Sequence, residues 1–270
     1  MLNPVGLTHG HYECRSLQET LPVFTDLLAM KVIERRNGRA VVQHPNTAWR
    51  LIVHEGGADA PDKPHNNHYG VRVAHAAEVD AAHAYLVANQ ARYGLKRVSP
   101  PRSQHFARSV YFEEPGGNTL EIEYYEPRAA AEGRTIARPH WRRELAPGEF
   151  PGRGYVPQAL THGTLECDDR EKSAAFCRDV LGLEIAGGGR LSVYVKHAAT
   201  PWYLVVLPIK RRKKFLGPAN RFTLTVASMD EVEKAHQALE GKVTELQPIE
   251  KSSFLFADPD RNWWEVASRA

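Results

Sequence analysis

The sequence predicts an α+β protein built from two tandem domains, and three observations lead to this prediction. A Leu-Thr-His-Gly segment at residues 7–10 recurs at residues 160–163. Short segments with the alternating apolar and polar pattern of β-strands follow one another through both halves of the chain. Between these strands, single segments have the spacing of an amphipathic helix. This combination is typical of sheets that carry helices on one face.

The repeat extends far beyond four residues. The displacement of 153 positions between the two segments also carries Trp49 onto Trp202. Further along, a displacement of 144 positions carries Glu121 onto Glu265, so the second copy is nine residues shorter between these points. A displacement that stays constant over a long stretch is the signature of a repeat. We infer that the chain contains an internal duplication.

Each copy divides again into two modules with the order β-α-β-β-β. In the first module, residues 5–14 alternate like a strand and residues 18–28 have helical spacing. Three further strands are expected there, at residues 31–36, 39–44 and 48–54. In the second module we expect a strand, a helix and three more strands, at residues 67–73, 78–91, 95–98, 108–113 and 119–125. The whole chain is therefore predicted to contain four such modules.

The two copies define the predicted domain boundaries. The first copy predicts a domain over residues 1–127, and the second copy predicts one over residues 158–270. Residues 128–157 are rich in Ala, Arg, Pro and Gly without a sustained period, which indicates a linker. A connection of this length is uncommon unless it packs on something, so we expect it to lie over one domain.

Composition and charge exclude several classes of protein. With 42% hydrophobic and 25% charged residues the chain has an ordinary globular composition, which argues against disorder. A net charge of +3 gives no reason to expect a nucleic-acid partner, and no segment has the roughly 20 apolar residues needed to cross a membrane. Three cysteines without a CxxC pair, and no signal peptide, favour the cytoplasm. We also expect a homo-oligomer.

Histidine and glutamate side chains gather on one face of the predicted strands. His9 and His11 share a face because strand side chains alternate, and Glu121 and Glu123 do so for the same reason. Such a polar face would be costly in a sealed core, so it predicts a wet cavity that holds a metal. Two imidazoles and one carboxylate are the ligands of open non-haem Fe(II) sites. We therefore predict a metal site among the histidines and glutamates of this face.

The doubled module resembles the vicinal oxygen chelate superfamily, which includes glyoxalases, bleomycin-resistance proteins and extradiol ring-cleavage dioxygenases. The resemblance covers the chain except the linker, and it implies that each domain forms a curled sheet around a metal-binding cavity. In that family the ligands lie on the first strand of each module and on the last strand of the second. His9, His68 and Glu121 occupy these places in the first copy.

One segment resembles extradiol dioxygenases in particular. Residues 110–117 (VYFEEPGG), followed by Glu121, resemble the signature of these enzymes, which also has a histidine upstream of its tyrosine, here His105. The resemblance implies an Fe(II) enzyme, alternatively an Mn(II) enzyme, that cleaves a catechol-like aromatic diol with dioxygen. His105 would be its acid–base residue, and Tyr111 would donate a hydrogen bond to the substrate. Two alternatives on the same fold are a glyoxalase-like isomerase or lyase and a resistance protein that binds a small molecule.

Three further residues of the first copy are assigned to substrate binding. His11 shares the face of His9, and Arg72 is suited to a substrate carboxylate. Trp49 stands where extradiol enzymes usually present a second active-site histidine, at the start of the fourth strand. The absence of that histidine leaves the ring-cleavage chemistry open.

The second copy departs from the ligand pattern. The residue that corresponds to His68 is Arg221, whose side chain is always charged and cannot bind a metal. We therefore expect the second domain to be a non-catalytic partner of the first.

Overall fold

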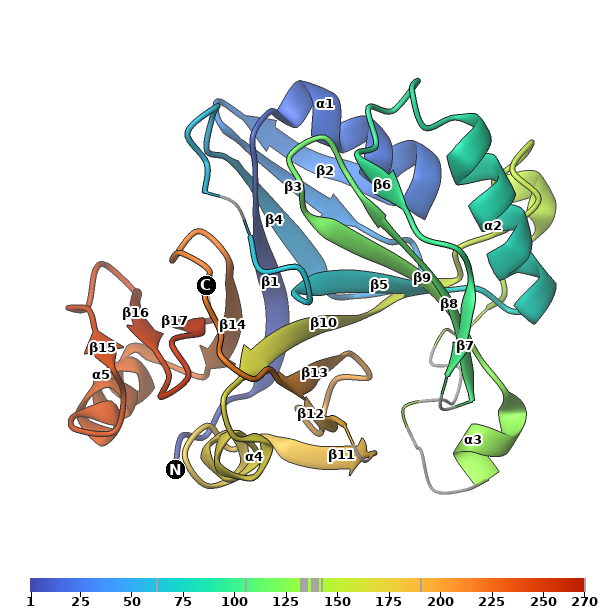
Figure 1. The fold of residues 1–270 in the computed structure, drawn as a ribbon. Helices are drawn as coiled ribbons and strands as arrows, with labels where there is room; N and C mark the ends of the chain where they lie inside the picture. Colours follow the sequence, from blue (N-terminus) through green and yellow to red (C-terminus); the bar gives the residue numbers. More distant parts are fainter. Residues whose placement is uncertain are drawn as a thin grey trace.

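The computed structural model describes residues 1–61, 63–104, 106–131, 136, 141, 143–189 and 191–269. Their strands form two curled sheets of eight and nine strands, and helices lie on the outer sides (Figure 1). The predicted α+β class and the curled sheets built from βαβββ modules are confirmed. Among the described residues, no helix combines the length and the apolar character required to span a bilayer.

The first sheet joins the first module of the chain to the last one. Its strand order is β15-β16-β17-β14-β1-β4-β3-β2, and the two modules meet where β1 pairs antiparallel with β14. The strands are β1 (Gly6–Cys14), β2 (Lys31–Arg36), β3 (Arg39–Gln43), β4 (Arg50–Glu55), β14 (Arg221–Val226), β15 (Glu245–Leu246), β16 (Ser253–Ala257) and β17 (Trp263–Ser268).

The second sheet joins the two middle modules. Its order is β11-β12-β13-β10-β5-β9-β8-β6, with the short strand β7 beside β8, and β10 pairs antiparallel with β5 at the junction. The strands are β5 (His68–Arg72), β6 (Arg97–Val98), β7 (Arg102–Gln104), β8 (Ala107–Glu113), β9 (Thr119–Tyr125), β10 (Ala159–Cys167), β11 (Glu184–Gly188), β12 (Val193–Lys196) and β13 (Tyr203–Pro208).

This crosswise pairing joins the two predicted domain ranges. Residues 1–127 and residues 158–270 each contribute one module to each sheet, so neither range builds a sheet of its own. The four modules are repeats, and the free edge of each first strand can form the same antiparallel ladder with several partners. The sequence pattern therefore predicts the modules but not which of them become neighbours.

Each module places one principal helix after its first strand. These helices are α1 (Leu17–Pro22) with its π-helical continuation (Val23–Leu27), α2 (Ala76–Ala88), α4 (Arg170–Asp179) and α5 (Met229–Leu239). Pro22 lacks an N–H group, which accounts for the widening of the first helix after that residue. In α5 the buried residues are Val232, Ala235 and Leu239, a spacing that turns one helix face toward the sheet.

The described part of the linker packs on the first half of the chain. It contains α3 (Pro127–Ala131) and a 3₁₀ turn (Pro147–Glu149). The buried Tyr155 donates a hydrogen bond from its hydroxyl to the carbonyl of Leu27, at 3.0 Å. The N–H of Val156 donates to Glu78 Oε1 at 2.8 Å. The expectation that this segment lies over other parts of the chain is confirmed for these residues.

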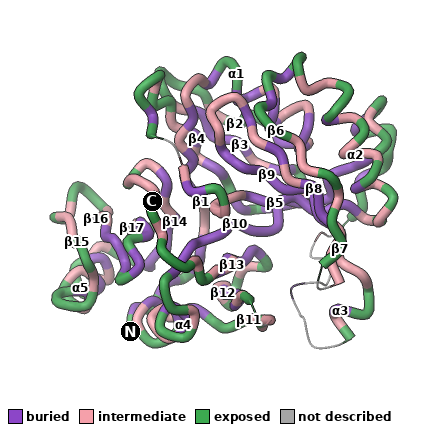
Figure 2. Tube along the Cα trace, in the orientation of Figure 1, coloured by how far each residue is buried: buried purple, intermediate pink, exposed green. Residues whose placement is uncertain are grey.

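Figure 2 shows that the strands β1, β5 and β10 are largely buried. A stacked pair of tryptophans packs against Gly10 of β1 and Tyr69 of β5. The ring centroids of Trp49 and Trp202 are 3.4 Å apart and the rings are inclined by 15°. Only 3% of Trp49 and 0% of Trp202 is exposed. A Cβ atom on Gly10 would lie 2.4 Å from the Trp49 ring, so the glycine of the repeated segment makes room for it. This position corrects the assignment of Trp49 to substrate binding.

We predict that Trp49→Ala lowers the free energy of unfolding by about 3–5 kcal/mol, because it leaves a cavity against Trp202. Trp49→Phe retains a ring and should cost less. Urea unfolding of both variants measures the difference. A loss below about 1 kcal/mol for the alanine variant would contradict a central role for the stacked pair.

Candidate metal centre

His68, Glu121 and His162 converge inside the second sheet, from β5, β9 and β10. Glu121 Oε2 lies 3.1 Å from His68 Nε2 and 3.0 Å from His162 Nε2. The two Nε2 atoms are 3.3 Å apart. The side chains are 9%, 5% and 2% exposed in the order His68, Glu121, His162, so the cluster is shielded from bulk water.

The spacing of these three atoms fits one face of a metal coordination sphere. Ligands at right angles around an ion with bonds of about 2.1 Å are about 3.0 Å apart. The donor set of two imidazoles and one carboxylate is that of open Fe(II) centres. Zinc, manganese and nickel accept the same donors. The residues present therefore fit a divalent metal, since their ligand atoms lie close enough together to hold one ion.

Hydrogen bonds to the far side of each ring fix the nitrogen that faces the centre. His68 Nδ1 lies 2.8 Å from the carbonyl oxygen of Asn66 and must carry a proton to donate to it. In a ring protonated on Nδ1 only, Nε2 would present its lone pair to a metal ion bound beside Glu121. Such outer contacts orient metal-binding histidines and raise their basicity.

His162 is oriented by a buried ion pair. Its Nδ1 lies 3.0 Å from Thr161 Oγ1 and 3.5 Å from Glu123 Oε1. Glu123 accepts two hydrogen bonds from Arg72, whose Nη2 also lies 3.0 Å from the Tyr203 hydroxyl. Arg72 is only 2% exposed and its guanidinium is occupied by these contacts. This corrects its assignment to a substrate carboxylate, because Arg72 instead supports the group behind His162.

Backbone features make room for His162. A Cβ atom on Gly70, the residue paired with it on β5, would lie 2.1 Å from the imidazole Cε1. Only glycine lets the ring cross the strand at this point. The β10–β5 ladder also shifts register between Leu160 and His162, and such bulges redirect side chains next to functional sites.

The electrostatics of the cluster favour a bound cation. Burial alone would raise the pKa of Glu121, but hydrogen bonds from His162 and His68 lower that pKa well below its usual range. Burial alone would lower the pKa of His162, but Glu123 and Glu121 raise it to about 9. A buried carboxylate thus stands between two imidazoles, and positive charge is favoured beside it. A metal ion can supply that charge in place of the proton.

A cavity of about 320 Å³ opens beside the three residues. Four tyrosines contribute to its wall, namely Tyr111, Tyr125, Tyr194 and Tyr203. The ring of Tyr111 meets that of His68 edge-on, with centroids 5.4 Å apart. Burial and the nearby Glu121 raise the pKa of Tyr111 well above its usual range, so its hydroxyl stays protonated. His105, the predicted acid–base residue, lies outside the described residues.

The structure corrects the predicted ligand set in one member. His9 lies in the first sheet, and His162 from the second copy takes its place beside His68 and Glu121. The second copy is therefore not merely a partner, since it supplies a residue of the centre. The signal was present in the sequence, because His162 is the histidine of the repeated Leu-Thr-His-Gly segment.

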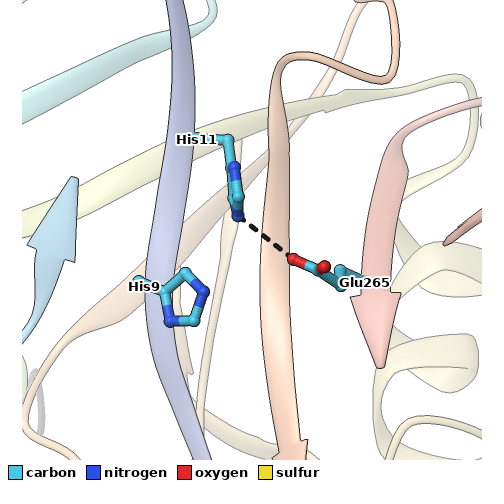
Figure 3. Close-up of side chains that lie close together, drawn as sticks. All are labelled: His9, His11 and Glu265. Carbon is cyan, nitrogen blue, oxygen red and sulfur yellow. Dashed lines mark ion pairs between the residues drawn. The ribbon is translucent and has the colours of Figure 1, made fainter. Parts of the chain in front are cut away.

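His9 belongs to a second cluster, with His11 and Glu265 (Figure 3). His11 does not line the cavity of about 320 Å³, but it lines a smaller cavity of about 30 Å³ that His68 also lines. Its assignment to substrate binding stays a prediction. Arg221 occupies the place that corresponds to His68, and its Nε lies 3.3 Å from Glu265 Oε2. Burial lowers the pKa of His9 to about 4 and that of His11 to about 3, so both rings are neutral near pH 7.

Fold and site together describe a protein in which paired βαβββ modules form a cavity beside a candidate metal-binding cluster. Residues 7–122 match the family model of the Glyoxalase/Bleomycin resistance protein/Dioxygenase superfamily. No curated protein sequence matches the chain. The match covers the first two modules, and over these residues it agrees with the resemblance inferred from the sequence.

Solved structures show a likeness of fold over almost the whole chain. A variant of glyoxalase I from Zea mays is 15% identical, with 97% of this chain and 93% of that one covered and a TM-score of 0.66. Another structure of glyoxalase I from Zea mays is 14% identical, covers 97% and 92%, and has a TM-score of 0.65. A provisionally assigned dioxygenase from Bacillus subtilis subsp. subtilis str. 168 is 13% identical, covers 99% and 86%, and has a TM-score of 0.63. At these identities the likeness concerns the fold.

We predict that His162→Ala or His68→Ala weakens the binding of Mn(II) to the cluster of His68, Glu121 and His162 by more than about 100-fold. Even the loss of a contact behind a ligand costs about 10- to 100-fold in metal affinity. His9→Ala is the matched control and should leave that binding unchanged. Calorimetric titration of the full chain with Mn(II) measures both. If the His9 variant loses this Mn(II) binding and the His162 variant keeps it, the ligand set is His9, His68 and Glu121, as predicted from the sequence.

Proposed function

We propose that this protein is a metal-dependent extradiol-type dioxygenase, which opens a catechol-like aromatic ring next to its two hydroxyl groups. His68, Glu121 and His162 would hold Fe(II), or alternatively Mn(II). The observation that carries the proposal is the open side of this triad. Three ligands occupy one face, and the cavity of about 320 Å³ adjoins them. When bound, the metal would bring the diol oxygens and dioxygen together and pass charge between them.

The cavity walls favour a small aromatic substrate. Its volume lies at the lower end of the range for small-molecule pockets. The rings of the four tyrosines offer flat surfaces against which an aromatic ring can pack. Val205 and Leu207 add apolar wall, so the pocket excludes water from one side of the substrate.

Tyr111 is the proposed hydrogen-bond donor to the substrate. It lies on β8 and pairs with Glu121 across the β8–β9 ladder, which places it beside the metal ligands. Its protonated hydroxyl can donate to a substrate oxygen that becomes more negative during the reaction. The acid–base role proposed for His105 remains a prediction from the sequence. His65 also lines the cavity and lies 3.3 Å from Glu113, so it is a second candidate for that role.

A glyoxalase-like lyase is the alternative reaction for this site. Such a lyase needs a base that can remove a proton from a substrate carbon. Among the described residues that line the cavity, Glu123 is the other carboxylate besides Glu121, and its Oε1 accepts hydrogen bonds from Arg72 and Thr161. This oxygen is therefore less available to act as that base.

The three cysteines are buried and unpaired, in keeping with a proposed cytoplasmic location.

The proposal predicts oxygen consumption. The full chain, reconstituted without air with Fe(II) or Mn(II), should consume dioxygen and form a yellow ring-fission product when a catechol is added. An oxygen electrode and visible absorbance measure this. His162→Ala should abolish the reaction, whereas His9→Ala should retain it. No oxygen uptake with any catechol and either metal, together with turnover of a 2-oxoaldehyde–thiol adduct, would replace the dioxygenase by the lyase.

Tyr111→Phe should lower kcat by roughly 10- to 100-fold, because it removes one hydrogen bond that strengthens as charge develops on the substrate. KM and Mn(II) affinity should change little. Tyr124→Phe is the control, since Tyr124 neighbours the cavity-lining Tyr125 on β9 but packs against the hydrophobic core. Steady-state kinetics decide the matter, and equal effects of the two substitutions would argue against a role for the Tyr111 hydroxyl.

A further inference from the structure

The cluster in the first sheet has the donor atoms of a metal site. One ligand atom each from His9, His11 and Glu265 lies within 4.8 Å of the others. His11 Nε2 is 3.2 Å from Glu265 Oε2, and the two imidazole centroids are 5.3 Å apart. Figure 3 shows both histidines on one strand, with Glu265 on another strand across from them. These atoms need only small side-chain movements to surround one ion.

The internal repeat shows how this cluster differs from the first. His9 and Glu265 correspond to His162 and Glu121, but Arg221 stands where the first centre has His68. The position of His11 is occupied by Thr164 in the other sheet. The cluster that lacks a histidine on β14 thus has an additional one on β1. This exchange keeps two imidazoles and one carboxylate together.

The orientation of both rings suits ligation. Thr8 Oγ1 lies 2.9 Å from His9 Nδ1, as Thr161 Oγ1 lies 3.0 Å from His162 Nδ1. His11 Nδ1 lies 2.8 Å from His54 Nε2. A proton on Nδ1 of His11 can be donated to His54, and Nε2 would then present its lone pair to an ion bound between it and Glu265. Each imidazole therefore has a hydrogen-bonding partner on its Nδ1 side that can orient the ring.

We propose that His9, His11 and Glu265 form a second metal site, which takes a divalent cation with a preference for imidazole, such as Zn(II). Imidazole is a good ligand for zinc, and a carboxylate completes a three-residue set with room for water. Arg221 weakens this site, because its guanidinium lies against Glu265 and is held there by the carbonyl of Pro218. We therefore expect this site to bind the metal more weakly than the cluster of His68, Glu121 and His162 does.

The test is the number of zinc ions bound by the full chain after equilibrium dialysis against Zn(II). The wild-type protein should bind two. His11→Thr introduces the residue found in the other sheet and should reduce the number to one, and His162→Ala should do the same. The double variant should bind none. His75→Asn, at the exposed start of α2, is the control and should still bind two. Because dialysis needs no turnover, this result does not depend on the dioxygenase proposal.

A second measurement tests the proposal without a His11 variant, in case that variant fails to fold. In the His162→Ala protein, Arg221→Gln should tighten the binding of the remaining zinc by about tenfold or more, since it removes a nearby positive charge. An unchanged or weaker affinity overturns the proposal. So does a wild-type protein that binds one zinc, or a His11→Thr protein that loses none.

Discussion

The antiparallel pairing of β5 with β10 is the interaction on which the metal centre depends. It joins the second module to the third and sets Gly70 opposite His162. Because strand register fixes which side chains share a face, this ladder also decides that His162 meets His68 and Glu121. The residues come from distant parts of the chain, yet a single ladder determines their separation. The cavity exists because the two curled modules close around that junction.

The buried pair of Arg72 and Glu123 adds rigidity to this arrangement. Burial alone would raise the pKa of Glu123, but Arg72 lowers it, so the carboxylate stays charged behind His162. A buried ion pair often contributes little to stability, since desolvation costs offset its attraction. Here the pair faces the Nδ1 side of His162, where a fixed carboxylate orients the ring. Its location argues for a role in positioning rather than in stability.

Much of the fold is predictable from the sequence, because strand alternation and the repeat are local or periodic signals. The strands predicted at 31–36 and 119–125 agree with β2 and β9. Glu121 and His68 are predictable as well, since their strand positions are set within one module. The prediction for His9 names the wrong cluster because it depends on which modules pair with each other. That pairing is set by tertiary contacts, which the local sequence pattern does not specify. For the same reason the sequence places Trp49 and Arg72 in the cavity, although packing and an ion pair hold them in the interior.

The two junction ladders, β1 with β14 and β5 with β10, are one contact made twice within a single chain. In a symmetric dimer of identical subunits, any substitution enters both equivalent interfaces at once. When the two copies are parts of one chain, a substitution can change one of the two ladders and leave the other unchanged. His68 and Arg221 can then differ although they hold equivalent places, and Gly70 can differ from Thr223. Fusion thereby breaks the symmetry, and one polypeptide can carry two pockets of unlike chemistry.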